Sequence, residues 1–413
     1  MNANPSNTDR DPAYGWVVVT GAALCMGLGN GALLTISVYL KPLVAEFGWD
    51  RGAISLAYML GCSGIGVGGI AMGWLSDRLP TRWLILMAAL TLVGVLYGLA
   101  HMSTLWEFYL LYTILGLVPV AACFSPLIAL TGKWFTHRKG LALGITTAGQ
   151  SLGYAVVPFL ARHLITLQGW RDAYLTLAFL CGGLLFVAAL LLREPSTSEA
   201  AKSPNTQHNK HGAGFLPARQ TVAWLSTAAI FSMALIGTAR LHMVPLIQDN
   251  GHAPQIAASV LSVLMVASLL GRLGFGRLAD SIGGLRSVLL AAVGQTLVIY
   301  LFMFSSSIIL FYLLGALFGV AYGAMMTCYM ICLREMVPLR NLGTSVGILG
   351  LLGWVGIGLG GWQGGLLFDA SGGYALPFAM ALLAGVVNVG ILLAFRWRLQ
   401  RHASGLTPQT QSA

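Results

Sequence analysis

The sequence predicts an all-α polytopic membrane protein with twelve transmembrane helices in two pseudo-symmetric six-helix bundles. Three observations predict this fold class: the composition, the recurrence of long apolar runs and an internal repeat. Of the 413 residues, 57% are hydrophobic and only 9% are charged. Soluble domains carry about 25% charged residues, so the composition excludes that class.

Apolar runs of about twenty residues recur along the whole chain, and each can cross roughly 30 Å of hydrocarbon. The twelve expected spans are 15–40, 52–76, 82–101, 104–130, 138–165, 171–193, 221–248, 255–280, 285–304, 307–334, 341–368 and 373–396. The first run is too long for the apolar part of a signal peptide, so we interpret it as an uncleaved helix.

The distribution of lysine and arginine predicts the orientation. If both termini are cytoplasmic, the outer segments contain only Lys41, Arg51, Arg162 and Arg171, and Arg240 and Arg272 lie within spans. The other basic residues all face inward, as the positive-inside rule requires. The rule also explains the net charge of +10 without a nucleic-acid partner. We expect a multi-pass protein of a bacterial inner membrane.

The longest polar stretch predicts the domain organisation. Residues 194–220 are rich in Ser, Pro, Asn and Lys, as flexible linkers are. We therefore expect a cytoplasmic tail at 1–14, six-helix bundles at 15–193 and 221–398, and a second cytoplasmic tail at 399–413. A ligand would lie between the bundles.

The two halves echo one another at the end of their second span. The first reads Gly73-Trp74-Leu75-Ser76-Asp77-Arg78-Leu79-Pro80-Thr81-Arg82, and the second reads Gly276-Arg277-Leu278-Ala279-Asp280-Ser281-Ile282-Gly283-Gly284-Leu285-Arg286. The spacing from glycine to aspartate is the same, and basic residues follow. Repeated halves are typical of transporters that rock about a central site.

These loops resemble the signature of the major facilitator superfamily, although Pro80 replaces a usual glycine. The resemblance implies that two sets of charges form cytoplasmic contacts that close an inner gate: Asp77, Arg78 and Arg82, and Asp280 and Arg286. The alternative is that they are ordinary positive-inside loop charges.

Three further stretches resemble the monocarboxylate transporter family and the related oxalate/formate exchangers. They are Asp11-Pro12-Ala13-Tyr14-Gly15-Trp16, the stretch from Trp134 to Gly149, and Arg272 four residues before Gly276. The resemblance implies transport of small monocarboxylates such as lactate or pyruvate, with a proton as the coupling ion.

Arg272 is the strongest candidate for binding the substrate. It precedes Asp280 by two helical turns, which places it roughly 12 Å inside the membrane if Asp280 marks the interface. Intramembrane arginines usually face a cavity and an anion, and a guanidinium can bind a carboxylate with two hydrogen bonds. The alternative is that its side chain extends to the inner interface.

Proton coupling needs a group that changes its protonation state. His242 and Asp249 are seven residues apart, two turns on one helix face, with Pro245 between them as an expected kink. Similar residues occur in bacterial members of the family. We expect a role in coupling or in an outer gate, with ordinary interface residues as the alternative; Arg240 is expected to extend outward.

Two tyrosines complete the expected site. Tyr322, within Gly319-Val320-Ala321-Tyr322-Gly323, resembles a family motif, and Tyr374 opens the last span. A phenol can donate to a carboxylate, but tyrosine is also a common interface anchor.

The chain departs from the animal branch of the family. Leu34 and Ser268 replace a lysine and an aspartate of that branch, so its proton relay cannot be transferred. The eleventh span also lacks the second cation of the oxalate exchangers, and one buried arginine suits a monoanion best.

The sequence thus predicts a transporter of monocarboxylates, with proton symport by alternating access and a monomer as the functional unit. Organic-anion exchange and drug efflux are the alternatives in the same class, and a non-transporting membrane sensor is the alternative in another. No enzyme constellation, metal set or soluble cofactor is implied. The six cysteines all lie in apolar spans and are interpreted as packing residues.

Overall fold

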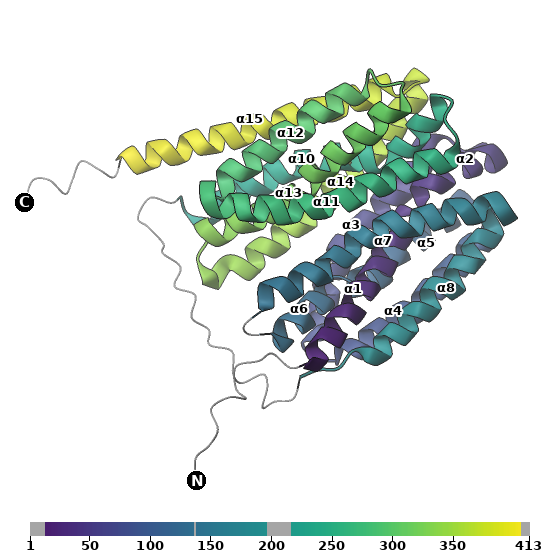
Figure 1. Cartoon of the computed structure of the whole chain (residues 1–413), viewed down its shortest axis with the longest axis horizontal. Coiled ribbons are helices and arrows are strands. Elements are labelled where there is room, and N and C mark those ends of the chain that lie inside the picture. Colours follow the sequence, from purple (N-terminus) through teal and green to yellow (C-terminus); the bar gives the residue numbers. More distant parts are fainter. Residues whose placement is uncertain (1–12, 136–137, 196–215, 406–413) are drawn as a thin grey trace, which may run out of the picture. The chain divides into compact units, whose positions relative to one another are not determined.

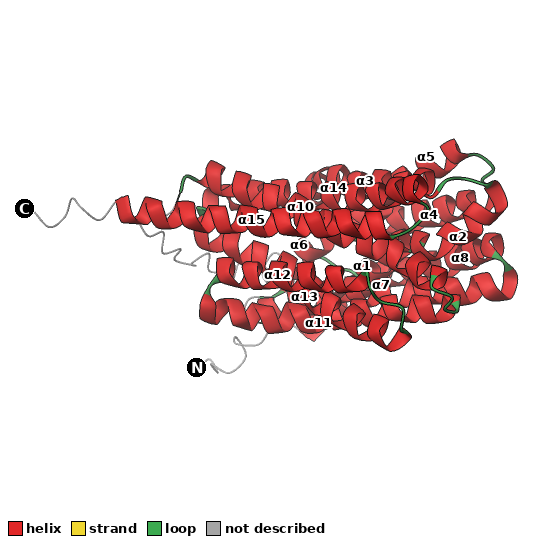
Figure 2. Cartoon of the chain, turned by 90° about the horizontal axis from the view of Figure 1, so that it is seen from above, coloured by secondary structure: helices red, strands yellow, loops and turns green. Residues whose placement is uncertain are grey.

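The fold was analysed in a computed structural model, which describes residues 13–135, 138–195 and 216–405. These residues form helices joined by short loops, and no β-strand occurs among them (Figure 2). Most of the expected N-terminal tail, most of the expected linker and the end of the expected C-terminal tail lie outside the described residues, as do Asp11, Pro12, Thr136 and His137 of the sequence motifs.

The described residues divide into two compact units (Figure 1). Unit 1 contains 13–35 and 67–195, and unit 2 contains 36–66 and 216–405. The helices of unit 1 are α1 Ala13–Leu34, α4 Thr81–His101, α5 Leu105–Leu115, the π-helix η2 Gly116–Val120, α6 Ser125–Trp134, α7 Lys139–Gln168 and α8 Trp170–Leu191. Those of unit 2 are α2 Ile36–Phe47, α10 Ala218–Asp249, α11 Pro254–Ile282, α12 Gly284–Phe302, α13 Ile308–Met336, α14 Leu339–Ser371 and α15 Ala375–Gly405.

The expected spans are confirmed as helices. The first extends to Phe47, and the last extends to Gly405, into the expected C-terminal tail; the other ends differ by a few residues. Eleven described segments are long and apolar enough to cross a membrane. The expected fifth span forms the 30-residue helix α7 but is not among the eleven. Its polar residues, Gln150, Arg162 and His163 among them, lower its hydropathy.

Two spans are interrupted. The first divides at Thr35, whose hydroxyl donates to the carbonyl oxygen of Ala32 at 2.8 Å. The expected fourth span consists of α5, η2 and α6, because Pro119 lies within the π-helical turn and removes a backbone donor. Such local breaks change the direction of a helix without exposing unpaired backbone groups to lipid.

In unit 1, α1 packs along α7, and α4 packs along α8. The first pair is joined by a buried polar group: the side-chain oxygen of Asn30 accepts from Gln150 at 2.9 Å and from the hydroxyl of Tyr154 at 3.1 Å. Hydrogen bonds between membrane helices contribute roughly 1 kcal/mol each, so this group fixes α1 on α7.

In unit 2, α11 packs along α13 and α10 packs along α14, while α15 covers α10 and α12. Small residues permit the close contacts: a Cβ at Gly323 of α13 would collide with the backbone oxygen of Ser268 on α11. The C-terminal part of α15 projects beyond the other helices of the unit (Figure 1).

The helix α3, Arg51–Ser76, contributes to both units. Its first part, together with α2, packs in unit 2, although the sequence places both in the N-terminal half. The division at the linker therefore stays a prediction, and residues 36–66 belong structurally to the unit of the C-terminal helices.

Candidate functional site

A group of four charged residues, which we call the charge cluster, lies at one end of unit 2: Lys41, Arg51, Asp249 and Asp369. Asp249 is the last residue of α10 and forms ion pairs with Lys41 at 2.6 Å and Arg51 at 2.8 Å. The Arg51 side chain is only 13% exposed, whereas those of Lys41 and Asp249 are about one third exposed. One carboxylate thus binds two cations from the segment 36–66.

The second carboxylate of the cluster caps a helix. Asp369 of α14 accepts from the backbone N–H groups of Arg51 at 3.1 Å and Gly52 at 2.6 Å. These N–H groups lie in the first turn of α3, where they have no intrahelical partner. A carboxylate there also interacts favourably with the helix dipole, so Asp369 fixes the start of α3 on α14.

A hydrogen-bond chain leads from the charge cluster into the unit. Arg51 donates to the hydroxyl of Tyr374 at 2.6 Å, and that hydroxyl lies 3.4 Å from Nδ1 of His242. Nε2 of His242 lies 2.7 Å from the carbonyl oxygen of Gly361, which can only accept. The proton of a neutral ring is therefore on Nε2, and Nδ1 accepts from Tyr374.

Aromatic rings enclose the arginine of this chain. The Arg51 guanidinium lies 3.8 Å from the ring centre of Phe368 and 5.3 Å from that of Tyr374. Cation–π contacts of this kind contribute about 0.5–1 kcal/mol when partly exposed. They restrict Arg51 to the position from which it reaches both Asp249 and Tyr374.

The first part of α3 lies against α14 along a seam of glycines. A Cβ at Gly365 would lie 2.6 Å from Oγ of Ser55 and 2.8 Å from Cα of Gly52. One at Gly358 would lie 2.9 Å from Cα of Met59. Because no side chain fits there, the two helices approach to backbone contact, and the charge cluster lies at the end of this seam.

The structure brings some of the predicted site residues together. His242, Asp249 and Tyr374 belong to one chain through Arg51. The helix α10 is continuous from Ala218 through Pro245 to Asp249, so the two-turn spacing of His242 and Asp249 applies.

The other two predicted binding residues lie on neighbouring helices. Tyr322 of α13 is 7% exposed, and Arg272 of α11 is partly buried. Tyr322 lies beside an arginine, since its ring centre is 5.9 Å from Cζ of Arg240. The expectation that Arg240 extends outward is wrong: its side chain is fully buried. The packing of α10 explains this, because the guanidinium lies beside Tyr322 of α13.

The two copies of the expected gating motif are exposed. Arg78 stacks on Trp74 at 3.6 Å in the turn after α3, and Asp77 and Arg82 are exposed beside it. Asp280 lies in the last turn of α11, and Arg286 lies in the first turn of α12. Among the described residues, none of these five charges takes part in an ion pair within 4.0 Å.

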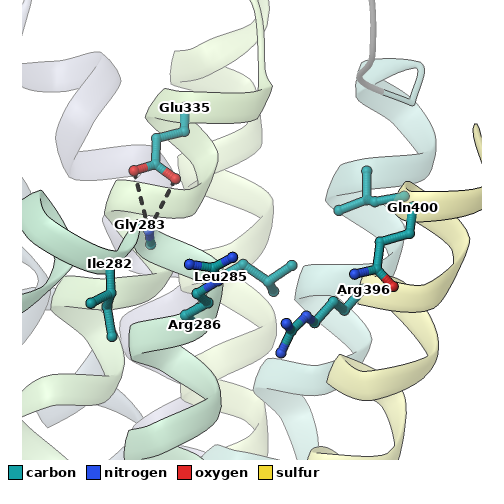
Figure 3. Close-up of a pocket in the computed structure, with 9 residues that line it drawn as sticks. Ile282, Gly283, Leu285, Arg286, Glu335, Arg396 and Gln400 are labelled. Carbon is teal, nitrogen blue, oxygen red and sulfur yellow. Dashed lines mark hydrogen bonds between the residues drawn. The ribbon is translucent and has the colours of Figure 1, made fainter. Parts of the chain in front are cut away.

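The second copy borders a pocket in unit 2 (Figure 3). Its lining residues come from the α11–α12 turn, α13 and α15: Ile282, Gly283, Gly284, Leu285, Arg286, Glu335, Arg396, Leu399 and Gln400. The carboxylate of Glu335 accepts from the backbone N–H of Gly284 at 3.1 Å. Glu335 therefore caps α12 where the motif ends.

Two of the family-like stretches meet in unit 1. The ring of Tyr14 lies 5.7 Å from that of Trp134, and the ring of Trp16 lies 4.8 Å from that of Phe135. A Cβ at Gly15 would lie 3.0 Å from the ring of Phe135. These stretches pack the start of α1 against the end of α6, which is a scaffolding role.

The sequence analysis missed three members of the charge cluster, Lys41, Arg51 and Asp369. A signal was present: Lys41 and Arg51 are two of the four cations at the sparsely charged ends of the expected spans. Cations at that side are disfavoured and therefore call for a specific partner. The acidic partner of each cation depends on how α2 and α3 pack on α10 and α14. The sequence of each helix taken alone does not reveal this packing.

The described residues contain no group of three His, Cys, Asp or Glu side chains that could bind a metal ion. All six cysteines are buried free thiols, which confirms their interpretation as packing residues. The chemistry available at the site is the pairing and release of charges, together with hydrogen bonding by Tyr374 and His242.

The comparisons with known proteins agree with this architecture. The profile described as Major Facilitator Superfamily matches residues 19–249 and 225–412. The chain is 28% identical to "Monocarboxylate transporter 13" of Rattus norvegicus over 91% of this chain and 88% of the relative. It is 26% identical to "Fujikurins efflux protein" of Gibberella fujikuroi over 92% of this chain and 82% of the relative.

Solved structures share the fold at low sequence identity. A D-xylose-proton symporter superimposes with a TM-score of 0.73 at 15% identity, covering 93% of this chain and 98% of that one. A bacterial homolog of the human lysosomal transporter Spinster superimposes with a TM-score of 0.72 at 16% identity, covering 96% of this chain and 99% of that one. Because the family profile matches nearly the whole length of the chain, the chain belongs to the Major Facilitator Superfamily.

Proposed function

We propose that this protein is a secondary active transporter of small monocarboxylates such as lactate or pyruvate, working by proton symport and alternating access. The observation that carries the proposal is the position of Asp249. One protonatable carboxylate binds two cations of the segment 36–66, and Arg51 connects it through Tyr374 to His242. A proton that neutralises Asp249 removes its attraction for both cations.

The coupling step follows from this geometry. With Asp249 ionised, Lys41 and Arg51 bind it, and α2 and α3 stay on the C-terminal helices. With Asp249 protonated, its attraction for the two cations is lost, and the contact of α2 and α3 with the end of α10 weakens. His242 can accept a proton at Nδ1, the nitrogen that faces Tyr374, and so link the cluster to the interior of the unit.

Substrate binding is assigned to Arg272, Tyr322 and Tyr374. The guanidinium of Arg272 offers two parallel donors to a carboxylate, and the tyrosine hydroxyls can donate to its oxygens. The resemblance to the monocarboxylate transporters supports this assignment, because Arg272 and Tyr322 match motif positions of that family.

A second set of charges is proposed to act at the opposite end of the helices. Asp77, Arg78, Arg82, Asp280 and Arg286 would pair when the charge cluster separates, so that one end is closed while the other is open. Their exposure and the lack of ion pairs among them in the described residues fit a conformation in which the charge cluster is closed.

The proposed setting is a bacterial inner membrane with both termini in the cytoplasm and a monomer as the functional unit. The distribution of basic residues supports this orientation. The charge cluster would then lie on the outer side, where protons enter from a more acidic medium. No cofactor is required, since the proton gradient supplies the driving force.

Organic-anion exchange or efflux is the second candidate, because the relatives include proteins named for the efflux of fujikurins and agnestins. The two candidates differ in the direction of transport. A symporter takes up lactate down an inward proton gradient, whereas an exporter exchanges an internal anion for external protons.

Uptake of radiolabelled L-lactate by proteoliposomes tests the proposal. We expect uptake that an inward proton gradient stimulates and that unlabelled pyruvate inhibits, without any anion inside the vesicles. Uptake that requires a preloaded anion would indicate exchange. An absence of uptake by correctly oriented, folded protein would reject the proposal.

A further inference from the structure

Arg240 is a guanidinium that the expected site does not include. Its side chain is fully buried, and the residue lies in the last third of α10. Arginine is almost never fully buried in proteins unless it is paired. An arginine within a membrane costs about 2.5 kcal/mol or more, and such residues usually mark functional positions. Its burial therefore calls for a role within the transport path.

The helix register gives the direction of the side chain. Thr238 donates to the carbonyl oxygen of Gly360 at 2.8 Å, and His242 bonds to Gly361, so both face α14. Arg240 follows Thr238 and precedes His242 by two residues, which is more than half a helical turn from each. Arg240 therefore faces away from α14, toward Tyr322 of α13.

Arg240, Tyr322 and Arg272 lie at increasing distances from one end of unit 2. The end of α10 and the beginnings of α11 and α13 lie at the same end of unit 2, because short loops join α10 to α11 and α12 to α13. At 1.5 Å per residue, Arg240 lies about 14 Å from that end, Tyr322 about 21 Å and Arg272 about 27 Å. Tyr322 is thus intermediate in depth between two arginines on adjacent helices.

We propose that Arg240 is a second carboxylate-binding residue, located between the charge cluster and Arg272 along the transport path. The proposal rests on the proposed function and extends its site. Arg240 can bind both oxygens of a carboxylate, and Tyr322 lies close enough to donate to the same anion. A carboxylate that enters past the charge cluster meets Arg240 first and Arg272 deeper in the unit.

The two-arginine arrangement leaves the expected substrate class unchanged. A single buried arginine favours a monoanion, and Arg240 and Arg272 can each bind one carboxylate. One carboxylate group binds to one arginine at a time, because Arg240 and Arg272 are about 13 Å apart along the helix axes. A small monocarboxylate therefore remains the substrate, and Arg240 affects its affinity.

The test measures thermal stabilisation by carboxylates of the full-length protein in detergent. The variants are Arg240→Gln, Arg240→Lys and, as a matched control on the same helix, Arg219→Gln, whose side chain is exposed. The ligands are L-lactate, pyruvate and oxalate. We expect lactate and pyruvate to stabilise the wild type and the control, with the apparent affinity reduced at least tenfold in Arg240→Gln.

Arg240→Lys keeps the charge and therefore keeps the folded protein testable if the glutamine variant does not fold. Because a lysine cannot form two parallel hydrogen bonds with a carboxylate, we expect a loss on the order of tenfold in affinity. The proposal would be overturned if both variants bound lactate and pyruvate with the affinity of the wild type. If only the lysine variant folds, unchanged affinity in that variant would overturn it.

The outcomes separate this proposal from the proposed function. If oxalate alone stabilises the wild type and Arg240→Gln loses that effect, monocarboxylate transport fails and the role of Arg240 stands. If lactate stabilises the wild type and both Arg240 variants equally, the proposed function stands and the role of Arg240 fails. If no carboxylate stabilises the wild type, both fail.

Discussion

Arg51 and Asp249 form an ion pair of 2.8 Å although 198 positions separate them along the chain. The pair connects the start of α3 to the end of α10, and Lys41 of α2 joins it at 2.6 Å. A contact between such distant segments forms only when α2 and α3 lie on the C-terminal helices. The ion pair therefore reports whether α2 and the start of α3 lie on the end of α10.

Replacing Asp249 with asparagine should uncouple transport from protons. The amide cannot ionise, so it mimics a permanently protonated carboxylate, and lactate uptake should no longer respond to a proton gradient. Since the pair is partly exposed, the free energy of unfolding should fall by no more than about 1 kcal/mol. Uptake with and without the gradient provides the measurement.

Asp50→Asn is the matched control for this prediction, because Asp50 is an exposed carboxylate in the adjacent loop. Its gradient dependence should equal that of the wild type. If Asp249→Asn also keeps the full dependence, Asp249 does not couple transport to protons, and His242 becomes the remaining candidate.

Replacing Gly365 with valine should prevent α3 from packing on α14. Even the first carbon of a side chain would lie 2.7 Å from the carbonyl oxygen of Arg51. Overpacking of this kind costs typically about 1–3 kcal/mol, and here the cost applies to the closed form of the charge cluster. We expect a strong loss of lactate uptake in proteoliposomes.

Gly350→Val on the same helix is the control, because a Cβ at Gly350 would meet no atom within 4 Å. It should retain most of the uptake. Wild-type uptake by Gly365→Val would mean that the seam does not have to close during the transport cycle.

The contacts of Glu194 with Thr81 and Lys133 should contribute to the stability of unit 1 in a pH-dependent way. Burial raises the pKa of Glu194, but hydrogen bonds from the backbone and hydroxyl of Thr81 and the charge of Lys133 lower it more, so the net pKa is below the ordinary value. A lowered pKa stabilises the folded state above the unfolded-state pKa. The contribution is lost as the pH falls through the folded-state pKa.

Glu194→Gln should therefore lower the thermal stability by a constant amount from neutral pH down to about pH 5. At lower pH the difference from the wild type should shrink. Asp172 is an exposed carboxylate of the same unit, so Asp172→Asn should change the thermal stability less than Glu194→Gln does at every pH above about 5. A Glu194→Gln deficit that grows on acidification would contradict the assigned direction of the shift.

The sequence predicted the helices well because each span must satisfy its own backbone hydrogen bonds and bury its own apolar surface. It also predicted His242, Asp249 and Tyr374 as candidate site residues, and the structure connects them through Arg51. Their functional roles stay predictions. Arg51 and Asp369 escaped prediction because their roles arise from contacts between distant helices.

Arg240 was the clearest error. From the sequence, an arginine near the end of a span was expected to reach the interface with its long side chain. In the structure the helix directs it toward Tyr322, where it is fully buried. The direction of a side chain around a helix axis depends on which neighbours the helix contacts, and a nearly uniform apolar sequence does not specify them.

The most direct test of the central claim is acidification of the vesicle lumen on addition of L-lactate, followed with a trapped pH dye. The wild type should acidify the lumen faster than protein-free liposomes, because each lactate enters with a proton. Arg272→Gln should reduce the rate to that of the liposomes. Proton-coupled lactate transport would be contradicted if folded wild-type protein acidified the lumen no faster than protein-free liposomes do. The role of Arg272 would be contradicted if Arg272→Gln acidified the lumen as fast as the wild type.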